Sequence, residues 1–343
     1  MNEARRANQG LMTDALTLRG VTFRPALFCA PMAGHTHSAF RRLVADFGGY
    51  GALFTEMLCG RWILSENLHR SPAARRRSAE GPVIYQLMLS EPGEVPAALD
   101  RLARAEPAGI DLNCACPAPS IRGVGAGSDL FEARARLAAV LTAMRRCHCG
   151  VLTVKIRLGA RREDWRERLA DRLRLFEECG VDAVILHPRF ADEKLKRRAR
   201  HELLAELAAS TRVPLIASGD IVGQHVVNER PERFAGVAGL MIGRMALVRP
   251  WVFAEWSGAD PPDDYHEVWT RFFDYACEDF TPPLALGRIK AFTAYYARNF
   301  LFGHRLFAAT QSAPDLAALR ERAGRFLGGA PALLRQPSAH VPF

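Results

Sequence analysis

Short apolar runs rich in β-branched residues recur along the chain, and a stretch of helical composition follows each of them. Eight such runs begin 24 to 43 residues apart, at 26–32, 51–56, 82–88, 109–113, 152–157, 181–187, 213–217 and 237–242. Apolar strands that alternate with helices indicate a parallel sheet covered by helices. Eight units predict an α/β fold, a (β/α)8 TIM barrel. The alternative is a doubly wound open sheet, but no Gly-x-Gly-x-x-Gly follows the first run.

Two further patterns flank these units. Before the first run, 16–19 and 21–24 surround a glycine and predict a hairpin that closes the barrel floor. After the last run, the stretch 260–264 predicts a linker, and three helices are expected beyond it, at 265–280, 286–302 and 313–327. We therefore expect a barrel domain over residues 1–255 and a C-terminal helical domain over residues 260–343.

Composition excludes several classes of protein. The 343 residues are 49% hydrophobic and 24% charged, which are ordinary globular values and exclude a disordered or fibrous chain. No apolar run reaches the roughly 18 residues of a membrane helix, and residues 1–9 lack the apolar core of a signal peptide, so we expect a cytoplasmic protein. Eight cysteines are then expected as thiols. The one-residue gaps in Cys114-Ala-Cys116 and Cys147-His-Cys149 do not fit a zinc site, and we predict no metal.

Positive charge is concentrated in particular segments. The net charge is +9, and residues 281–343 hold eight basic against two acidic residues. Further clusters follow the second, fifth and sixth strands: Arg70 with Arg75-Arg-Arg77, Arg161-Arg162, and Lys194, Lys196, Arg197, Arg198 and Arg200. Because the ends of parallel strands meet on one rim, these clusters predict contact with a polyanion such as RNA. A single cluster would be explained equally well as a solvated helix start.

The predicted strand ends carry polar or reactive side chains. In a TIM barrel these ends form the active site, and the loops after strands seven and eight bind phosphate. Gly219 and Gly243 lie in those loops, where they let backbone N–H groups approach an anion or merely form tight turns, and Arg244 adds a charge. Lys155 on strand five suits the negative edge of a reduced flavin. Gln86 suits the polar edge of the same ring or is a buried core amide.

Two further side chains allow a functional and a structural interpretation. His187 either contacts the flavin ring or is a buried, hydrogen-bonded histidine. Cys114 and Cys116 could face the same way on an extended strand. Cys116 precedes Pro117, where the strand gives way to a loop, so we expect Cys116 to be the accessible thiol and Cys114 a small buried hydrophobe. A thiol above a flavin can act as the general acid in reduction of a carbon–carbon double bond.

Several motifs, taken in order, resemble those of the tRNA-dihydrouridine synthase family. They are Ala30-Pro-Met-Ala-Gly34 with Phe40-Arg-Arg42, Thr55-Glu-Met57, Asp111-Leu-Asn-Cys-Ala-Cys-Pro117, Gly125-Ala-Gly-Ser128, Val154-Lys-Ile-Arg-Leu-Gly159, His187-Pro-Arg189, Ser218-Gly-Asp-Ile221 and Met241-Ile-Gly-Arg244. The resemblance covers roughly residues 25 to 255, and the basic tail resembles the family's RNA-binding domain. It implies reduction of uridine to 5,6-dihydrouridine in RNA, most often tRNA, by an enzyme with bound FMN and NADPH as reductant.

The resemblance also implies roles for individual residues. Cys116 would protonate C5 of the uracil and Asn113 would hydrogen-bond the target base. The flavin ring would be held by Pro31, Met32, Ala33, Gln86, Lys155 and His187, and the phosphate end by Ser218, Gly219, Asp220, Gly243 and Arg244. We further assign Arg189, Arg197 and Arg198 to the RNA substrate, tRNA or another structured RNA.

The chain departs from the family pattern at three positions. Ala115 replaces a glycine, Pro188 replaces a glycine and Ser218 replaces an asparagine, and none of these changes removes an essential functional group. Two other functions stay open: an FMN barrel acting on a free small molecule, as dihydroorotate dehydrogenase does, and a non-catalytic RNA-binding barrel. The first would not need the basic tail, and the second would leave Cys116, Lys155 and Gln86 without a chemical task.

Overall fold

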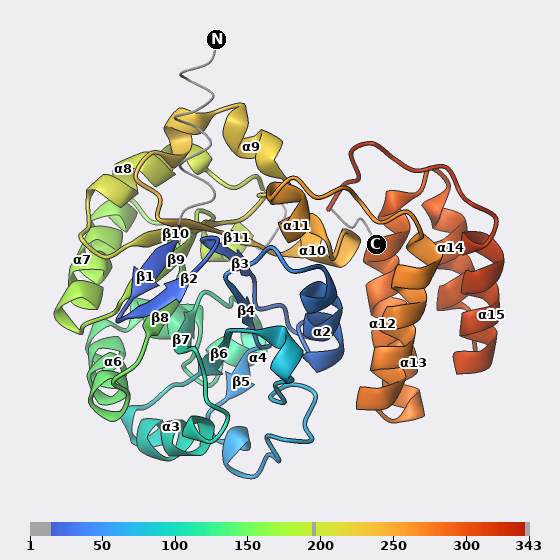
Figure 1. Cartoon of the computed structure of the whole chain (residues 1–343). Coiled ribbons are helices and arrows are strands. Elements are labelled where there is room, and N and C mark those ends of the chain that lie inside the picture. The colour runs from blue at the N-terminus through green and yellow to red at the C-terminus, as the bar shows by residue number, and fades with distance from the viewer. Residues whose placement is uncertain (1–14, 194–196, 340–343) are drawn as a thin grey trace.

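The computed structural model describes residues 15–193 and 197–339. In this part of the chain eight parallel strands form a closed barrel (Figure 1): β3 (Leu27–Cys29), β4 (Ala52–Phe54), β6 (Val83–Met88), β7 (Gly109–Cys114), β8 (Leu152–Arg157), β9 (Ala183–His187), β10 (Leu215–Ser218) and β11 (Gly239–Ile242). Each strand pairs with the next, and β11 pairs with β3 to close the ring. The predicted (β/α)8 barrel is confirmed.

Helices connect the strands and cover the outside of the barrel (Figure 1). They are α2 (Ser38–Phe47), α3 (Val95–Ala103), α4 (Pro119–Arg122), α5 (Ser128–Glu132), α6 (Arg134–Cys147), α7 (Trp165–Glu178), α8 (Leu204–Ala209), α9 (Gln224–Asn228), α10 (Arg244–Val248) and α11 (Val252–Trp256), with the 3-10 turns η1 (Trp62–Leu64), η2 (Ser78–Glu80), η3 (Pro92–Glu94), η4 (Ala191–Glu193), η5 (His201–Leu203) and η6 (Pro231–Phe234). Alternate strand residues such as Leu112 and Val154 are fully buried in the core that these helices share. The intervening residues face the barrel interior.

The predicted hairpin is present at the start of the described chain. Strand β1 (Leu16–Leu18) pairs antiparallel with β2 (Val21–Phe23), and Phe23 packs edge-on against Phe28 of β3 with ring centroids 5.6 Å apart. Together with apolar side chains from the lower ends of the strands, the hairpin forms a second apolar cluster that fills the barrel floor. A short additional strand, β5 (Leu58–Cys59), continues along β6 and was not predicted.

The C-terminal region is a group of helices beside the barrel (Figure 1): α12 (Tyr265–Asp279), α13 (Pro282–Tyr296), α14 (Gly303–Gln311) and α15 (Leu316–Leu327), with η7 (Ala297–Asn299). The predicted helix 286–302 has the wrong bounds, and α14 was missed. Helix α13 begins earlier because proline is favoured in a first helical turn, where its missing N–H is not needed. The chain turns after Tyr296, where the Asn299 side chain donates to the carbonyls of Val248 and Tyr296 at 2.6 and 3.0 Å.

Ion pairs and a hydrogen bond attach this helical region to loops of the barrel. The carboxylate of Asp279 pairs with Arg75 and with Arg77, the latter at 2.7 Å. Arg288 of α13 donates to the carbonyl of Gly34, in the loop after β3, at 2.9 Å. Both parts share one hydrophobic core. No helix within the described ranges is long and apolar enough to cross a membrane.

Candidate active site

A cleft with a volume of about 270 Å3 opens at the carboxyl ends of the barrel strands. The predicted cofactor residues all line it, namely Pro31, Met32, Ala33, Gln86, Lys155, His187, Ser218, Gly219, Asp220, Gly243 and Arg244. Asn113, Cys116 and Arg189 line it as well, whereas Arg197 and Arg198 lie outside it on the exposed rim. The strand ends therefore bring Pro31 and Arg244, which are 213 residues apart in sequence, into one cavity.

A row of hydrogen bonds crosses three strands behind the cleft. Gln86, Asp111 and Thr153 are register neighbours on β6, β7 and β8, and the Asp111 carboxylate accepts from Gln86 Nε2 at 2.7 Å and from Thr153 Oγ1 at 2.6 Å. Gln86 Oε1 in turn accepts from Asn113 Nδ2 at 2.8 Å. Burial raises the pKa of Asp111 to about 6, although its two hydrogen bonds and Lys155 oppose the rise. Each amide in this row is thereby fixed in one orientation.

This row ends at the loop that carries the accessible thiol. Asn113 Oδ1 accepts from the backbone N–H groups of Ala115 and Cys116, at 3.1 and 3.0 Å. Cys116 is partly exposed and lines the cleft, whereas Cys114 is buried among the outer helices, where burial raises its thiol pKa well above the usual value. The two cysteines differ because β7 ends at Cys114 and the chain turns there toward the mouth. The structure thus places Cys116, and not Cys114, in the cavity.

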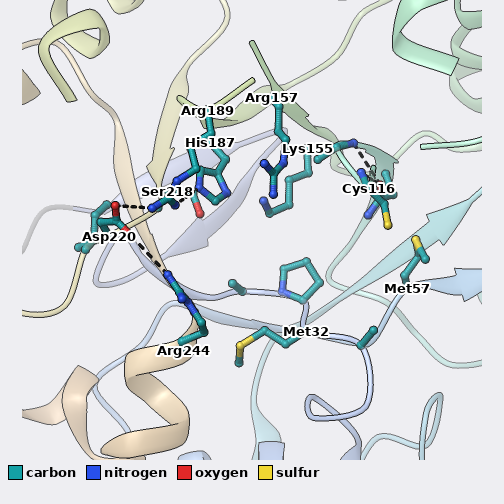
Figure 2. A pocket seen from close by; sticks show the side chains of 18 of the residues that line it. Met32, Met57, Cys116, Lys155, Arg157, His187, Arg189, Ser218, Asp220 and Arg244 are labelled. Carbon is teal, nitrogen blue, oxygen red and sulfur yellow. Dashed lines mark hydrogen bonds and ion pairs between the residues drawn. The ribbon is translucent and has the colours of Figure 1, made fainter. Parts of the chain in front are cut away.

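Two buried cations stand in the middle of the cleft (Figure 2). Lys155 and Arg157 are alternate residues of β8, so both point inward. Burial, reinforced by Arg157, lowers the pKa of Lys155 to about 8, and burial together with Arg189 lowers the pKa of Arg157 to about 10. At neutral pH both side chains carry a positive charge that water screens only weakly. Lys155 lies beside Asn113 in the strand register, on the side of the cleft that holds Cys116.

The opposite end of the cleft is organised around Asp220 (Figure 2). Its carboxylate accepts from Arg189 Nη2 at 2.5 Å, from the Ala199 N–H at 2.8 Å and from Arg244 Nη2 at 3.4 Å. Burial alone would raise the pKa of Asp220, but the bonds from Arg189 and Ala199 hold it below its ordinary value. Asp220 therefore fixes two guanidinium groups at this end of the cavity.

His187 is a neutral imidazole at the same end. Burial, and then the surrounding cations, lower its pKa well below the usual range. Its Nε2 lies 2.6 Å from Arg189 Nη1, and because a guanidinium can only donate, Nε2 accepts and the proton sits on Nδ1. Arg189 is completely buried by these contacts, at the end of the cleft away from Cys116 (Figure 2). The substrate contact that we predicted for Arg189 stays a prediction.

The lining of the cleft suits an anionic group. The residues that line the cleft include four cations and one carboxylate. The cations are Lys155, Arg157, Arg189 and Arg244, and the carboxylate is Asp220. At Gly219, where φ is +96°, an added Cβ would lie 2.5 Å from the His187 ring, so the backbone approaches that ring as only glycine allows. Apolar residues from the loop after β3 form another wall, with Met32 visible there in Figure 2.

Several lining residues were not predicted as site residues. Arg157 is one of them, although its two-residue spacing from Lys155 was a sufficient signal. Met57, Met245 and Ala339 also contact the cavity. Ala339 follows the last described helix by 12 residues, and no sequence pattern relates it to a strand end.

The basic clusters of the rim have different environments. Arg75 and Arg77 bind Asp279, so they attach the helical region instead of facing solvent freely. Arg161 and Arg200 both pair with Glu193 at 2.6 Å. Arg197 and Arg198 are exposed, while Lys194 and Lys196 lie outside the described residues.

Comparison with known proteins identifies this arrangement. The model of the dihydrouridine synthase family matches residues 28–280, which span the barrel and α12. The chain belongs to the dihydrouridine synthase family. It is 32% identical over 248 residues to tRNA-dihydrouridine synthase B of Xanthomonas campestris, a match that covers 68% of this chain and 69% of that protein. The corresponding protein of Pseudomonas aeruginosa is 30% identical over 233 residues, covering 67% and 68%.

Solved structures with a similar fold are more distant in sequence. An old yellow enzyme homologue from Zymomonas mobilis matches with a TM-score of 0.56 at 11% identity, over 78% of this chain and 99% of that one. Histamine dehydrogenase from Rhizobium sp. 4-9 matches with a TM-score of 0.57 at 10% identity, over 78% and 51%. At these identities the likeness concerns the barrel fold alone, and it agrees with the fold of this dihydrouridine synthase family member.

Proposed function

We propose that this chain reduces a uridine of tRNA to 5,6-dihydrouridine in the cytoplasm, with FMN as bound cofactor and NADPH as reductant. Membership in the dihydrouridine synthase family supports the reaction and a flavin-dependent chemistry. The observation that carries the proposal is the combination, in one cavity, of the Cys116 thiol and a cation-rich end around Asp220.

The residues of the cleft suggest how FMN would be held. Arg189, Arg244 and the backbone around Gly219 and Gly243 would bind the phosphate, because charged donors and close backbone approach favour an anion. Lys155 would stabilise the negative charge that a reduced flavin carries. Bound there, FMN would supply the hydride for C6 of the uracil.

The loop after β7 would position the base and provide the proton. Asn113 Nδ2 uses one hydrogen on Gln86, so its second hydrogen is available for a carbonyl of the uracil. Addition of hydride at C6 leaves an enolate-like anion, and the Cys116 thiol would donate its proton to C5. The backbone N–H groups of Ala115 and Cys116 donate to Asn113 Oδ1, so the side chain that would contact the base and the residue that carries the thiol are held next to each other.

Access of a tRNA uridine to this depth requires that the base leave its stack. The exposed Arg197 and Arg198 and the basic helical region would then contact phosphates at the mouth. A role of α12–α15 in binding RNA is supported by their position, because Arg288 of α13 reaches the loop after β3 at the mouth.

The test is made with purified full-length protein. We expect a yellow protein that binds one FMN per chain and converts tRNA lacking dihydrouridine with NADPH, but leaves free uridine unchanged. A ribosomal RNA fragment of matched length is assayed beside the tRNA, to compare the two classes of RNA as substrates. Failure to bind FMN on titration would refute the proposal, and equal activity on free uridine would instead support the small-molecule reductase.

A further inference from the structure

Trp62 presents an indole to solvent on the first residue of η1. Its side chain is 76% exposed, whereas Trp251, Trp256 and Trp269 are buried and Trp165 packs against Phe190. Among the described residues no other ring or guanidinium lies over the Trp62 indole. Leu64 of the same turn is 48% exposed, and Val124, in the loop between α4 and α5, is 56% exposed.

The turn that carries Trp62 lies at the mouth end of the barrel, five residues after a residue that lines the cleft. Met57 lines the cavity, and β5 follows it directly. Strand β5 pairs with Leu87 and Met88 at the carboxyl end of β6, and the Gly60 N–H donates to the Met88 carbonyl at 3.0 Å. Trp62 follows two residues later, so it lies at the end of the barrel where the chemistry takes place.

Ion pairs connect the Trp62 turn to the loop of the catalytic thiol. Arg61 binds Glu94 at 2.5 Å, in the connection between β6 and α3. From the other side Arg136 pairs with Glu91 of the same connection at 3.9 Å and donates to the Gly125 carbonyl at 3.2 Å. The loop that holds Gly125 and Val124 returns to the Ser128 N–H, which donates to the Cys116 carbonyl at 3.0 Å. Trp62 and the Cys116 loop therefore flank one short segment of the rim.

The charged residues of the loops that carry Trp62 and Val124 indicate what kind of ligand would bind there. Arg61, Arg70 and Arg122 are exposed in the two loops; Arg61 pairs with Glu94, whereas Arg70 and Arg122 form no ion pair within the described ranges. Flat apolar surface beside cations is the combination that binds single-stranded nucleotides, with bases stacked on the ring and phosphates on the arginines. A uridine swung into the cleft leaves its neighbouring base without a stacking partner, and an indole on the rim can replace that partner.

We propose that Trp62 is a stacking platform for an unpaired base next to the target uridine, and so a positioning residue for the tRNA substrate. This inference rests on the proposed function. Stacking on Trp62 would stabilise the tRNA in its reactive conformation. Loss of the indole should therefore lower kcat/KM and tRNA affinity, and should not change the reaction of the flavin with NADPH.

The test compares Trp62→Ala with Trp62→Phe and with the matched control Leu64→Ala, an exposed apolar residue of the same turn. Loss of base–aromatic stacking is worth about 1–3 kcal/mol, so Trp62→Ala should lose about 5- to 150-fold in kcat/KM on tRNA. Trp62→Phe should retain activity within about threefold, and Leu64→Ala within about twofold. FMN content and NADPH oxidation should be unchanged in all three. Binding of tRNA should quench tryptophan fluorescence in the wild type and not in Trp62→Phe.

The inference is overturned if kcat/KM on tRNA changes less than twofold in Trp62→Ala, or if Leu64→Ala loses as much. A parallel loss of NADPH oxidation would also overturn it. If Trp62→Ala dissociates a protein oligomer, the patch is a protein interface and the inference is wrong. The proposed function fails separately: a wild type that binds tRNA through Trp62 yet forms no dihydrouridine would keep the platform and remove the reaction.

Discussion

The hydrogen-bond row behind Cys116 depends on one carboxylate, that of Asp111. Replacing Asp111 by Ala leaves Gln86 Nε2 and Thr153 Oγ1 without their acceptor in a fully buried site. Each unsatisfied buried group costs about 1–3 kcal/mol, so the free energy of unfolding should fall by about 2–6 kcal/mol. Asp111→Asn is the matched control, because its amide oxygen still accepts from Gln86 and its NH2 can donate to the Thr153 hydroxyl. At pH 4, where Asp111 is protonated and neutral like the amide, that control should stay within about 1.5 kcal/mol of the wild type.

Asp111→Ala should also lower the rate of dihydrouridine formation, because Asp111 holds Gln86 and Gln86 holds Asn113. A loosened Asn113 no longer fixes the Cys116 loop, and misplacement of a reacting group by about 1 Å can lower a rate about 100-fold. Urea unfolding measures the stability, and single-turnover formation of dihydrouridine measures the rate. If Asp111→Ala and Asp111→Asn are equally stable and equally active, the row does not position the thiol and the reasoning is refuted.

The titration of Asp111 provides an independent check of the same row. Its pKa is about 6 in the folded protein against an ordinary value of 3.8, so between these pH values the folded state holds more protons than the unfolded state. Stability contributed by this group is therefore present at low pH and is lost as the pH rises through about 6, by on the order of 3 kcal/mol. From pH 4 to pH 7 the unfolding free energy of the wild type should fall by this amount relative to that of Asp111→Asn. Parallel pH profiles would contradict it.

Two further predictions concern the cofactor and the RNA. Gly219→Ala places a Cβ 2.5 Å from the His187 ring at a positive φ, so FMN affinity measured by titration should fall at least tenfold, while an alanine substitution at exposed Gly93 should leave it unchanged. Reversing Arg197 and Arg198 to Glu should weaken tRNA binding and flatten its salt dependence in filter-binding assays while NADPH oxidation stays intact; unchanged RNA affinity would reassign both side chains to a solvated face.

The fold was predictable because its signal is local and repeated. Each strand is a short apolar run whose two faces are both buried, so the eight runs stand out from the helical stretches between them. The prediction failed where a tertiary contact decides the local structure. Helix α13 ends because the Asn299 side chain caps carbonyls of Val248 and Tyr296, and such a contact leaves no periodic pattern in the sequence.

The candidate site was predictable for the same reason, since strand ends of a barrel converge wherever the strands are found correctly. Gln86, Lys155 and Asp220 all line the cleft as expected. The sequence did not indicate that Arg75 and Arg77 would pair with Asp279, because the acidic partner lies more than 200 residues away. Charge clusters predict the sign of a surface, and only the packing determines which charges remain free.

The most direct test of the account is the oxidation of reduced enzyme by tRNA in the Cys116→Ala variant. A positioned acid contributes about 10² to 10⁴ in rate, so this variant should bind FMN, accept electrons from NADPH and bind tRNA normally, yet form dihydrouridine at least about a hundredfold more slowly. Cys114→Ala should behave like the wild type, because that thiol is buried away from the cleft. If Cys116→Ala reacts at the wild-type rate, or if Cys114→Ala is the slow variant, Cys116 is not the proton donor and the proposed chemistry of the cleft is wrong.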